Sequence, residues 1–229
     1  MKVGVWQSNY LPWKGYFDYI NDVDVFCWYD EVEYTKNNWR NRNRIFGNNG
    51  LFWITIPVDR KYNSKKISEV PINNKKILNN HFKSIQQNYS KAPYKNAILN
   101  LLYPYLVENP SDTLSKLNHS LIESICKYAG ITTKFVNSKN YILKDTRLDR
   151  LTYLLQQLNA TTYLSGLNAK NYITGSENEF DKIGCKLEWK NYGPYLKYER
   201  SGNHYDDYVS IIDVLMHIPQ NKVLSYIKS

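Results

Sequence analysis

The chain has 229 residues and a mass of 27.1 kDa, with 42% hydrophobic and 22% charged residues, which excludes a disordered or fibrous protein and allows a self-sufficient core. Lys and Arg total 30 against 21 acidic residues, and the resulting net charge of +9 suits nucleic acid, acidic lipid or a small phosphorylated ligand. The sequence has no long apolar segment, no signal-peptide pattern and no paired cysteine motif, so we expect a soluble protein of the reducing cytoplasm without a membrane span.

Short runs of alternating or continuous apolar residues predict strands along the whole chain. These runs cover residues 1–7, 24–29, 52–58, 134–137, 162–165 and 186–189. Between them, apolar residues at helical spacing predict amphipathic helices around residues 77–85, 114–125 and 148–158. Ser111 or Asp112 is expected to cap the second of these helices and Gly130 to end it. Strands that alternate with helices predict an α/β fold with a mainly parallel sheet and Rossmann-like layering.

The domain organisation expected from the sequence is simple. No internal repeat, low-complexity tract or linker rich in Gly, Ser or Pro divides the chain, so we expect one domain over residues 1–229. The central block at about residues 73–128 is almost entirely helical in pattern. We expect it to form a helical layer or insertion on a sheet built from the two flanks.

Polar side chains follow two of the expected strands directly. In parallel α/β sheets, ligands bind outside the carboxyl ends of the strands, where loops expose backbone N–H groups. The candidate substrate-binding residues at this edge are Gln7, Asn9, Tyr10 and Trp13, with Ser165 and Gly166 after a later strand. The alternative is that the aromatic residues belong to the core and that the polar residues only finish ordinary turns.

The segment at residues 30–44 is the most informative part of the sequence. Four cations within residues 36–44 alternate with Asn side chains and one Trp, and no acidic residue lies among them. Arg pairs with phosphate oxygens, amides bind sugar hydroxyls and aromatic faces stack on rings, so the segment predicts a phosphorylated ligand that carries a ring. The candidate binding residues are Tyr34, Lys36, Trp39, Arg40, Asn41 and Arg42. A solvated surface hairpin is the alternative.

Two residues are candidates for catalytic proton transfer. Asp30 follows the second expected strand, and His81 lies in the register of the apolar stripe of a helix, where it could act as a general base. The alternative for His81 is a satisfied, partly buried side chain, and His119 has the same ambiguity with less context. Glu31 and Glu33 lie near Asp30, but their spacing is not a metal signature, so we assign no metal ligand and note that a phosphate can carry Mg²⁺ into such a site.

The motifs above, taken together, resemble the WbqC-like family. They are QSNYLPWKGYF at 7–17, Asp30, YTK at 34–36, WRNRN at 39–43, TIPV at 55–58, His81, APY at 92–94, YLSG at 163–166 and SIID at 210–213. They occur in the family's order over nearly the whole chain. One departure is Ser8, where the family pattern often has Pro.

The resemblance implies a role in bacterial surface polysaccharide synthesis, such as that of O-antigen in lipopolysaccharide. We expect a cytoplasmic transferase that attaches an acyl or aminoacyl group to a nucleotide-linked amino sugar. The donor would be a thioester of coenzyme A or of an acyl or peptidyl carrier protein. The alternatives are a nucleotidyl-transfer or other phosphate-centred enzyme, and a non-catalytic binding protein of a polysaccharide assembly complex. Nucleic acid fits less well, because the cations concentrate in residues 36–66 rather than along an extended groove.

Overall fold

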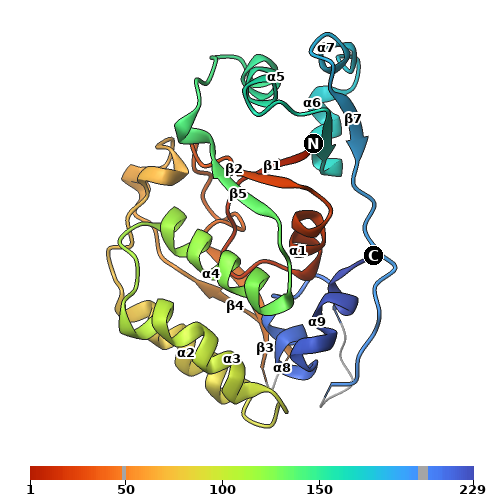
Figure 1. Cartoon of the computed structure of the whole chain (residues 1–229). Coiled ribbons are helices and arrows are strands. Elements are labelled where there is room, and N and C mark those ends of the chain that lie inside the picture. Colours follow the sequence, from red (N-terminus) through yellow and green to blue (C-terminus); the bar gives the residue numbers. More distant parts are fainter. Residues whose placement is uncertain (48–49, 201–205) are drawn as a thin grey trace.

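A parallel sheet forms the centre of the computed structural model, which describes residues 1–47, 50–200 and 206–229 (Figure 1). Within these ranges its strand order is β5-β2-β1-β6-β7, and every neighbouring pair is parallel. The strands are β1 (Lys2–Trp6), β2 (Val25–Trp28), β5 (Lys134–Asn137), β6 (Thr162–Ser165) and β7 (Lys186–Trp189). The predicted α/β class with a mainly parallel sheet is confirmed.

The strand order reverses at β1, and this reversal places helices on both faces of the sheet. The chain passes from β1 to β2 and β5 on one side, then returns beyond β1 to β6 and β7. Because crossovers between parallel strands are right-handed, the two directions of winding place their helices on opposite faces. Accordingly, α1 (Lys14–Asn21) and α4 (Leu114–Ala129) lie on one face and α5 (Arg147–Gln157) on the other (Figure 1).

Alternate residues of the strands supply the two halves of the hydrophobic core. Phe26 and Trp28 of β2 belong to the larger cluster, on the side of α1 and α4, whereas Val25 and Cys27 belong to the smaller cluster with α5. Burial, followed by the charge of Asp30, raises the pKa of the Cys27 thiol to about 12. Cys27 is therefore an inert core residue, as its place in an apolar strand predicts.

Between β2 and β5 the chain forms an antiparallel hairpin and a helical layer. The hairpin consists of β3 (Arg42–Gly47) and β4 (Gly50–Thr55), and the layer of α2 (Lys76–Asn88), α3 (Lys95–Tyr103) and α4. The strand expected at residues 52–58 therefore begins earlier and does not join the parallel sheet. Its partner is β3, because a short connection returns the chain antiparallel, whereas a parallel pair needs a long crossover.

The capping of α4 differs from the prediction at its first residue. Thr113 caps the helix, since its Oγ1 accepts a hydrogen bond from the backbone N–H of Lys116, and neither Ser111 nor Asp112 has this role. Asp112 instead pairs with Lys75 at 2.6 Å. Gly130 ends the helix as predicted, in a left-handed conformation with φ of 79°, where a side chain would be strained.

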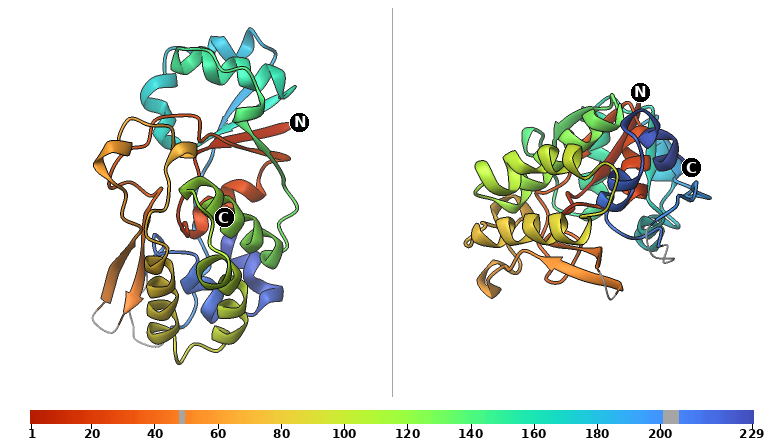
Figure 2. Two further views of the ribbon diagram at one scale, coloured as in Figure 1. Left: turned by 90° about the vertical axis from the view of Figure 1, so that its left-hand side faces the viewer. Right: turned by 90° about the horizontal axis from the view of Figure 1, so that it is seen from below.

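The remaining elements complete both layers. Residues 170–181 carry α6 (Lys170–Ile173) and α7 (Asn178–Asp181) next to β7. After β7, Lys190 and Tyr195 bind Asp18 of α1, and the chain reaches α8 (Ile212–His217) and α9 (Gln220–Ile227) on the opposite face (Figure 2). Single short turns of helix occur at Arg60–Tyr62, Ile67–Glu69, Pro104–Glu108, Ser138–Asn140 and Leu167–Ala169.

Throughout the described ranges, the helices lack the combination of length and apolar character that crossing a bilayer requires.

Candidate functional site

A buried carboxylate lies where the loops after β1 and β2 meet. Asp30 is fully buried. It accepts hydrogen bonds from the backbone N–H of Ser8 (2.8 Å), from Ser115 Oγ (2.5 Å) and from His119 Nε2 (2.9 Å). The first of these bonds needs a backbone N–H, which a proline at this position would not have. Ser8 thus gives this chain a contact to the carboxylate that a proline could not make.

Helix α4 supplies two of the three donors to Asp30. Ser115 and His119 are four residues apart, so they lie on the same face of the helix, one turn from each other. That face also carries buried Asn118. Ser115 and Asn118 lie within the stripe of leucines and isoleucines that the sequence predicts to be buried, and polar residues in such a stripe need partners. Two polar residues within this apolar stripe are the signal in the sequence that a polar site lies at α4.

The protonation of the pair follows from its contacts. Burial alone would raise the pKa of Asp30, but the hydrogen bonds and charge of His119, with the bonds from Ser115 and Ser8, outweigh burial and hold that pKa below its ordinary value. An ionised carboxylate can only accept hydrogen bonds, so Nε2 of His119 donates the bond to Asp30. No residue of the described ranges bonds to Nδ1, which has a lone pair in the neutral form of such a ring.

His119 is the part of this pair that solvent reaches. Its side chain is 15% exposed, against 1% for that of Asp30. The imidazole stacks on Trp28, with ring centroids 4.1 Å apart and planes 16° apart, and Trp28 in turn stacks on Phe135 of β5. The stack fixes the plane of the ring and Asp30 fixes its rotation, so the folded protein determines where Nδ1 points.

Arg40 is a buried cation next to the loop after β1. Its guanidinium donates hydrogen bonds to the side-chain oxygens of Gln7 and Asn9. Its carbonyl accepts a hydrogen bond from Asn118 Nδ2 (2.9 Å), which also donates to Ser8 Oγ (3.3 Å). The structure therefore joins Arg40 to Gln7 and Asn9, as our interpretation of the sequence requires, and connects all three to α4.

The charge of Arg40 is only partly compensated. Burial lowers the pKa of Arg40, while the negative charge of Asp30 raises it. Arginine keeps its charge in proteins, and both side-chain partners of this one are neutral amides. Across the described ranges, no carboxylate lies within salt-bridge distance of it. An anionic group of a ligand is the partner that this cation would bind best.

His81 lies on α2, and its two interactions are with other elements. It is 5% exposed, its Nδ1 is 3.0 Å from Tyr10 Oη, and it has a hydrogen bond with the backbone of Thr55. Burial lowers its pKa to about 4, so the ring is neutral at pH 7. This environment is that of a satisfied buried histidine. The catalytic role of His81 stays a prediction, and Tyr10 here serves to hold His81.

The predicted binding segment after β2 divides into inward and outward side chains. Asn41 is buried with Arg40, and its Nδ2 donates to the carbonyl of Ile56 (2.8 Å). Tyr34 is also buried, and its Oη has no hydrogen-bond partner within the described part of the chain. Lys36, Trp39 and Arg42 lie on the outer side of the segment, with Lys36 exposed and Trp39 41% exposed.

The other predicted residues lie away from Asp30. Trp13 packs against the rings of Tyr192, Tyr195 and Tyr208. Ser165 is fully buried, and its carbonyl accepts the backbone N–H of Lys190 (2.8 Å). A Cβ atom added to Gly166 would meet nothing closer than Tyr192 Oη at 3.7 Å, so a small side chain has room there. Among the described residues, no hydrogen bond, ion pair or ring contact joins Trp13, Ser165 or Gly166 to Arg40 or Asp30.

The acidic residues after β2 do not converge. Asp30 turns inward to His119, whereas Glu31 pairs with Lys66 at 3.0 Å. In the ranges that the structure describes, no three His, Cys, Asp or Glu side chains come together in a group able to hold a metal ion. Any Mg²⁺ at this site would therefore depend on ligand oxygens for its coordination.

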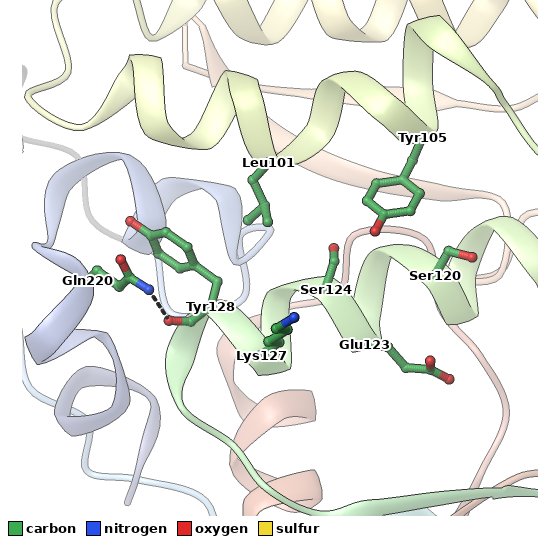
Figure 3. A pocket seen from close by; sticks show the side chains of 8 residues that line it. All are labelled: Leu101, Tyr105, Ser120, Glu123, Ser124, Lys127, Tyr128 and Gln220. Atoms are coloured by element: carbon green, nitrogen blue, oxygen red, sulfur yellow. Dashed lines mark hydrogen bonds between the residues drawn. The ribbon is translucent and has the colours of Figure 1, made fainter.

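A groove of about 640 Å³ opens on a different face of α4 (Figure 3). Tyr105, Glu123 and Tyr128 are among its lining residues, and Gln220 closes one end by donating to the carbonyl of Tyr128 (3.1 Å). Asp30, Arg40 and His119 are not among them. The groove is thus distinct from the candidate site.

Known proteins support the resemblance found in the sequence. The chain is 41% identical over 218 residues to Uncharacterized protein Rv1507c of Mycobacterium tuberculosis, a match that covers 95% of this chain and 94% of that protein. No solved structure matches the chain significantly. Residues 7–225 match the profile of the WbqC-like protein family. The chain therefore belongs to the WbqC-like protein family.

Proposed function

We propose that the chain is an enzyme of bacterial surface-glycan precursor synthesis that transfers an acyl or aminoacyl group to a nucleotide-linked amino sugar. The observation that carries this proposal is the pair of Asp30 and His119. A buried, ionised carboxylate fixes a partly exposed imidazole, next to the buried cation of Arg40, and Nδ1 of that imidazole has no partner in the described ranges. The glycan substrate and the cytoplasmic location follow from the family resemblance.

The proposed reaction uses His119 as a general base. The amine nitrogen of the sugar attacks the thioester carbonyl of the donor, a C–N bond forms and the C–S bond breaks. Nδ1 of His119 accepts the proton that the amine loses, and the imidazolium returns a proton to the departing thiolate, so that the products are an amide and a thiol. The negative charge of Asp30 stabilises the imidazolium while it exists.

Arg40 would hold the anionic part of a substrate in this reaction. Its bonds to Gln7 and Asn9 fix the guanidinium before the ligand arrives, so little conformational entropy is lost when a phosphate binds. The position of Arg40 in the loop network at the end of β1 places this cation at the edge of the sheet where α/β proteins bind ligands.

The test is direct incubation of the purified chain with nucleotide-linked amino sugars and acyl or aminoacyl thioesters, with products followed by mass spectrometry. His119→Gln should lower kcat by about 10²–10⁴-fold and leave substrate affinity nearly unchanged. Arg40→Gln should mainly raise KM. His217→Gln, on α8, is the matched control and should behave as the wild type.

Two results would contradict the proposal. One is the absence of both product and binding with every pair of donor and acceptor. The other is full turnover by folded His119→Gln, because the reaction would then not use this imidazole. Turnover of a nucleoside triphosphate with Mg²⁺, measured in parallel, would favour the phosphate-centred alternative.

A further inference from the structure

Two exposed tryptophans lie side by side at the β3–β4 hairpin. Trp39 and Trp53 are 41% and 44% exposed, and their ring centroids are 5.4 Å apart. The guanidinium carbon of Arg42 lies 4.3 Å from the centre of the Trp53 ring, and that of Arg44 lies 5.8 Å from it. Tryptophan is largely buried on average, so an exposed pair of indoles beside arginines indicates a binding surface.

The register of the hairpin explains why these side chains face outward. Arg44 pairs with Trp53, so the two share one face, while Ile45 and Ile54 lie on the other face and are buried. Figure 2 shows the hairpin at the edge of the molecule, with α2 on one side of it. The face that carries Trp53 is therefore the one that the core does not use.

The outward residues are separate from the network around Asp30. The side chain of Arg40 turns to Gln7 and Asn9, whereas that of the preceding residue, Trp39, turns to Trp53. The side chains of the adjacent residues Trp39 and Arg40 therefore point in opposite directions. The hairpin surface is thus a second group of side chains, separate from that network.

Two hydrogen-bond donors near this surface have no acceptor. Tyr34 is 2% exposed, and among the residues that the structure describes neither its Oη nor the buried Nε of Arg42 has a hydrogen-bond partner. Burial raises the pKa of Tyr34 and the charge of Arg42 lowers it, so the two groups are near enough to interact. Buried donors without acceptors are rare in folded proteins. The oxygen of an anionic ligand would supply what both of them lack.

The charges of the surface also favour an anion. Lys36 is exposed, and among the described residues neither Lys36 nor Arg42 lies in a salt bridge. Arg44 is partly neutralised by Asp206 at 3.4 Å. Arg42, over the Trp53 ring, and Lys36, three residues before Trp39, are therefore cations without an acidic partner among the described residues, and a phosphate group is complementary to them.

We infer that Tyr34, Lys36, Trp39, Arg42 and Trp53 form a subsite for the nucleoside phosphate part of a ligand. The base lies on the indole faces, and the phosphate oxygens accept hydrogen bonds from Arg42 and Tyr34. A single pair of rings 5.4 Å apart suits one base, whereas a nucleic acid strand needs a series of such faces. The inference rests on the proposed function, in which the substrate is a nucleotide-linked sugar. It assigns the residues that bind the nucleotide part of that substrate.

The test is binding of uridine, guanosine, cytidine and adenosine diphosphates to the intact chain, followed by calorimetry and by tryptophan fluorescence. We expect at least one of them to bind and to change the fluorescence, because both indoles are exposed at the surface. Trp53→Leu should weaken binding about tenfold or more, the scale of one base on one aromatic ring, and Arg42→Gln should weaken it as well.

Matched controls separate this subsite from general effects on the fold. Tyr103→Leu removes another exposed aromatic ring, on α3, and Arg150→Gln removes an arginine of α5; both should leave the affinity unchanged. If Trp53→Leu does not fold by circular dichroism, Trp53→Thr replaces it, since a β-branched residue suits the strand.

The results of the binding assay distinguish failure of the nucleotide subsite from failure of the proposed transfer reaction. Nucleotide binding that depends on Trp53 would support the subsite even if no transfer is detected, in which case only the proposed function fails. Absence of binding by all four diphosphates, or equal affinity of wild type and Trp53→Leu, would overturn the subsite whatever the transfer assay gives. Tighter binding of an oligonucleotide than of any mononucleotide, with steep salt dependence, would also overturn it in favour of a strand.

Discussion

Acidification should destabilise the protein through His81, and the size of the effect can be worked from the structure. In the folded chain, burial lowers the pKa of His81 to about 4, whereas an unfolded chain has the ordinary value of 6.5. Between these two pH values the unfolded chain binds more protons than the folded one. The contribution of neutral His81 to stability is therefore complete above pH 6.5 and is lost as the pH falls toward 4.

The magnitude follows from the two pKa values. A tenfold change in a proton-binding constant corresponds to about 1.4 kcal/mol, so lowering the pKa from 6.5 to about 4 corresponds to about 3 kcal/mol at pH 4 and below. At pH 4.5 the loss should already be about 2.5 kcal/mol. This is a large share of the stability of an ordinary domain.

The assay is urea unfolding by circular dichroism at pH 7.5, 6, 5 and 4.5, on the wild type, His81→Gln and the control His217→Gln. The other titrating groups are common to all three chains, so the difference between wild type and His81→Gln isolates the effect of His81. That difference should shrink by about 2.5 kcal/mol between pH 7.5 and 4.5. Transfer by folded His81→Gln, measured at pH 7.5, tests the predicted catalytic role of His81, and full activity would refute that role. Parallel pH curves for wild type and His81→Gln would refute the buried, neutral state of this ring.

Three further predictions concern single positions. Asp30→Asn removes the charge that orients His119, so transfer should fall about 10²–10⁴-fold in steady-state kinetics; a variant with normal kcat would show that the carboxylate is not needed. Thr113→Ala should lower the free energy of unfolding by about 1 kcal/mol in urea, because the cap of α4 is lost, while Thr113→Ser should restore most of it. Gly4→Ala should lower the melting temperature and cost about 1–3 kcal/mol, because the new Cβ would lie 2.7 Å from a ring carbon of Tyr19; an unchanged melting temperature would mean that this ring can move aside.

The elements that the sequence predicts best depend on local periodicity. The strands at residues 134–137, 162–165 and 186–189 have the predicted bounds, because each is a short apolar run between turn residues. The helix around residues 114–125 was predicted from one apolar stripe. The hairpin was half missed, because β3 alternates Arg and Asn with few apolar residues, and only its pairing with β4 reveals it as a strand.

The candidate site depends much more on the tertiary structure. The sequence placed Gln7, Asn9 and Asp30 at the carboxyl edge of the sheet, since parallel strands end at the same edge. It could not show that the partner of Asp30 is His119, 89 residues further along the chain, rather than His81. The packing of α4 against the sheet brings His119 to Asp30, because side chains distant in sequence meet only where the packing of whole elements places them.

The sequence alone also does not determine in which direction each side chain of a segment points. Trp39, Arg40 and Arg42 are consecutive or nearly so, and their residue types alone predict one phosphate-binding cluster. The folded chain turns Arg40 toward the loop after β1 and leaves Trp39 and Arg42 outside. Residue chemistry determines which ligands a segment can bind, whereas backbone direction and the packing of neighbouring elements decide which side chains can act together.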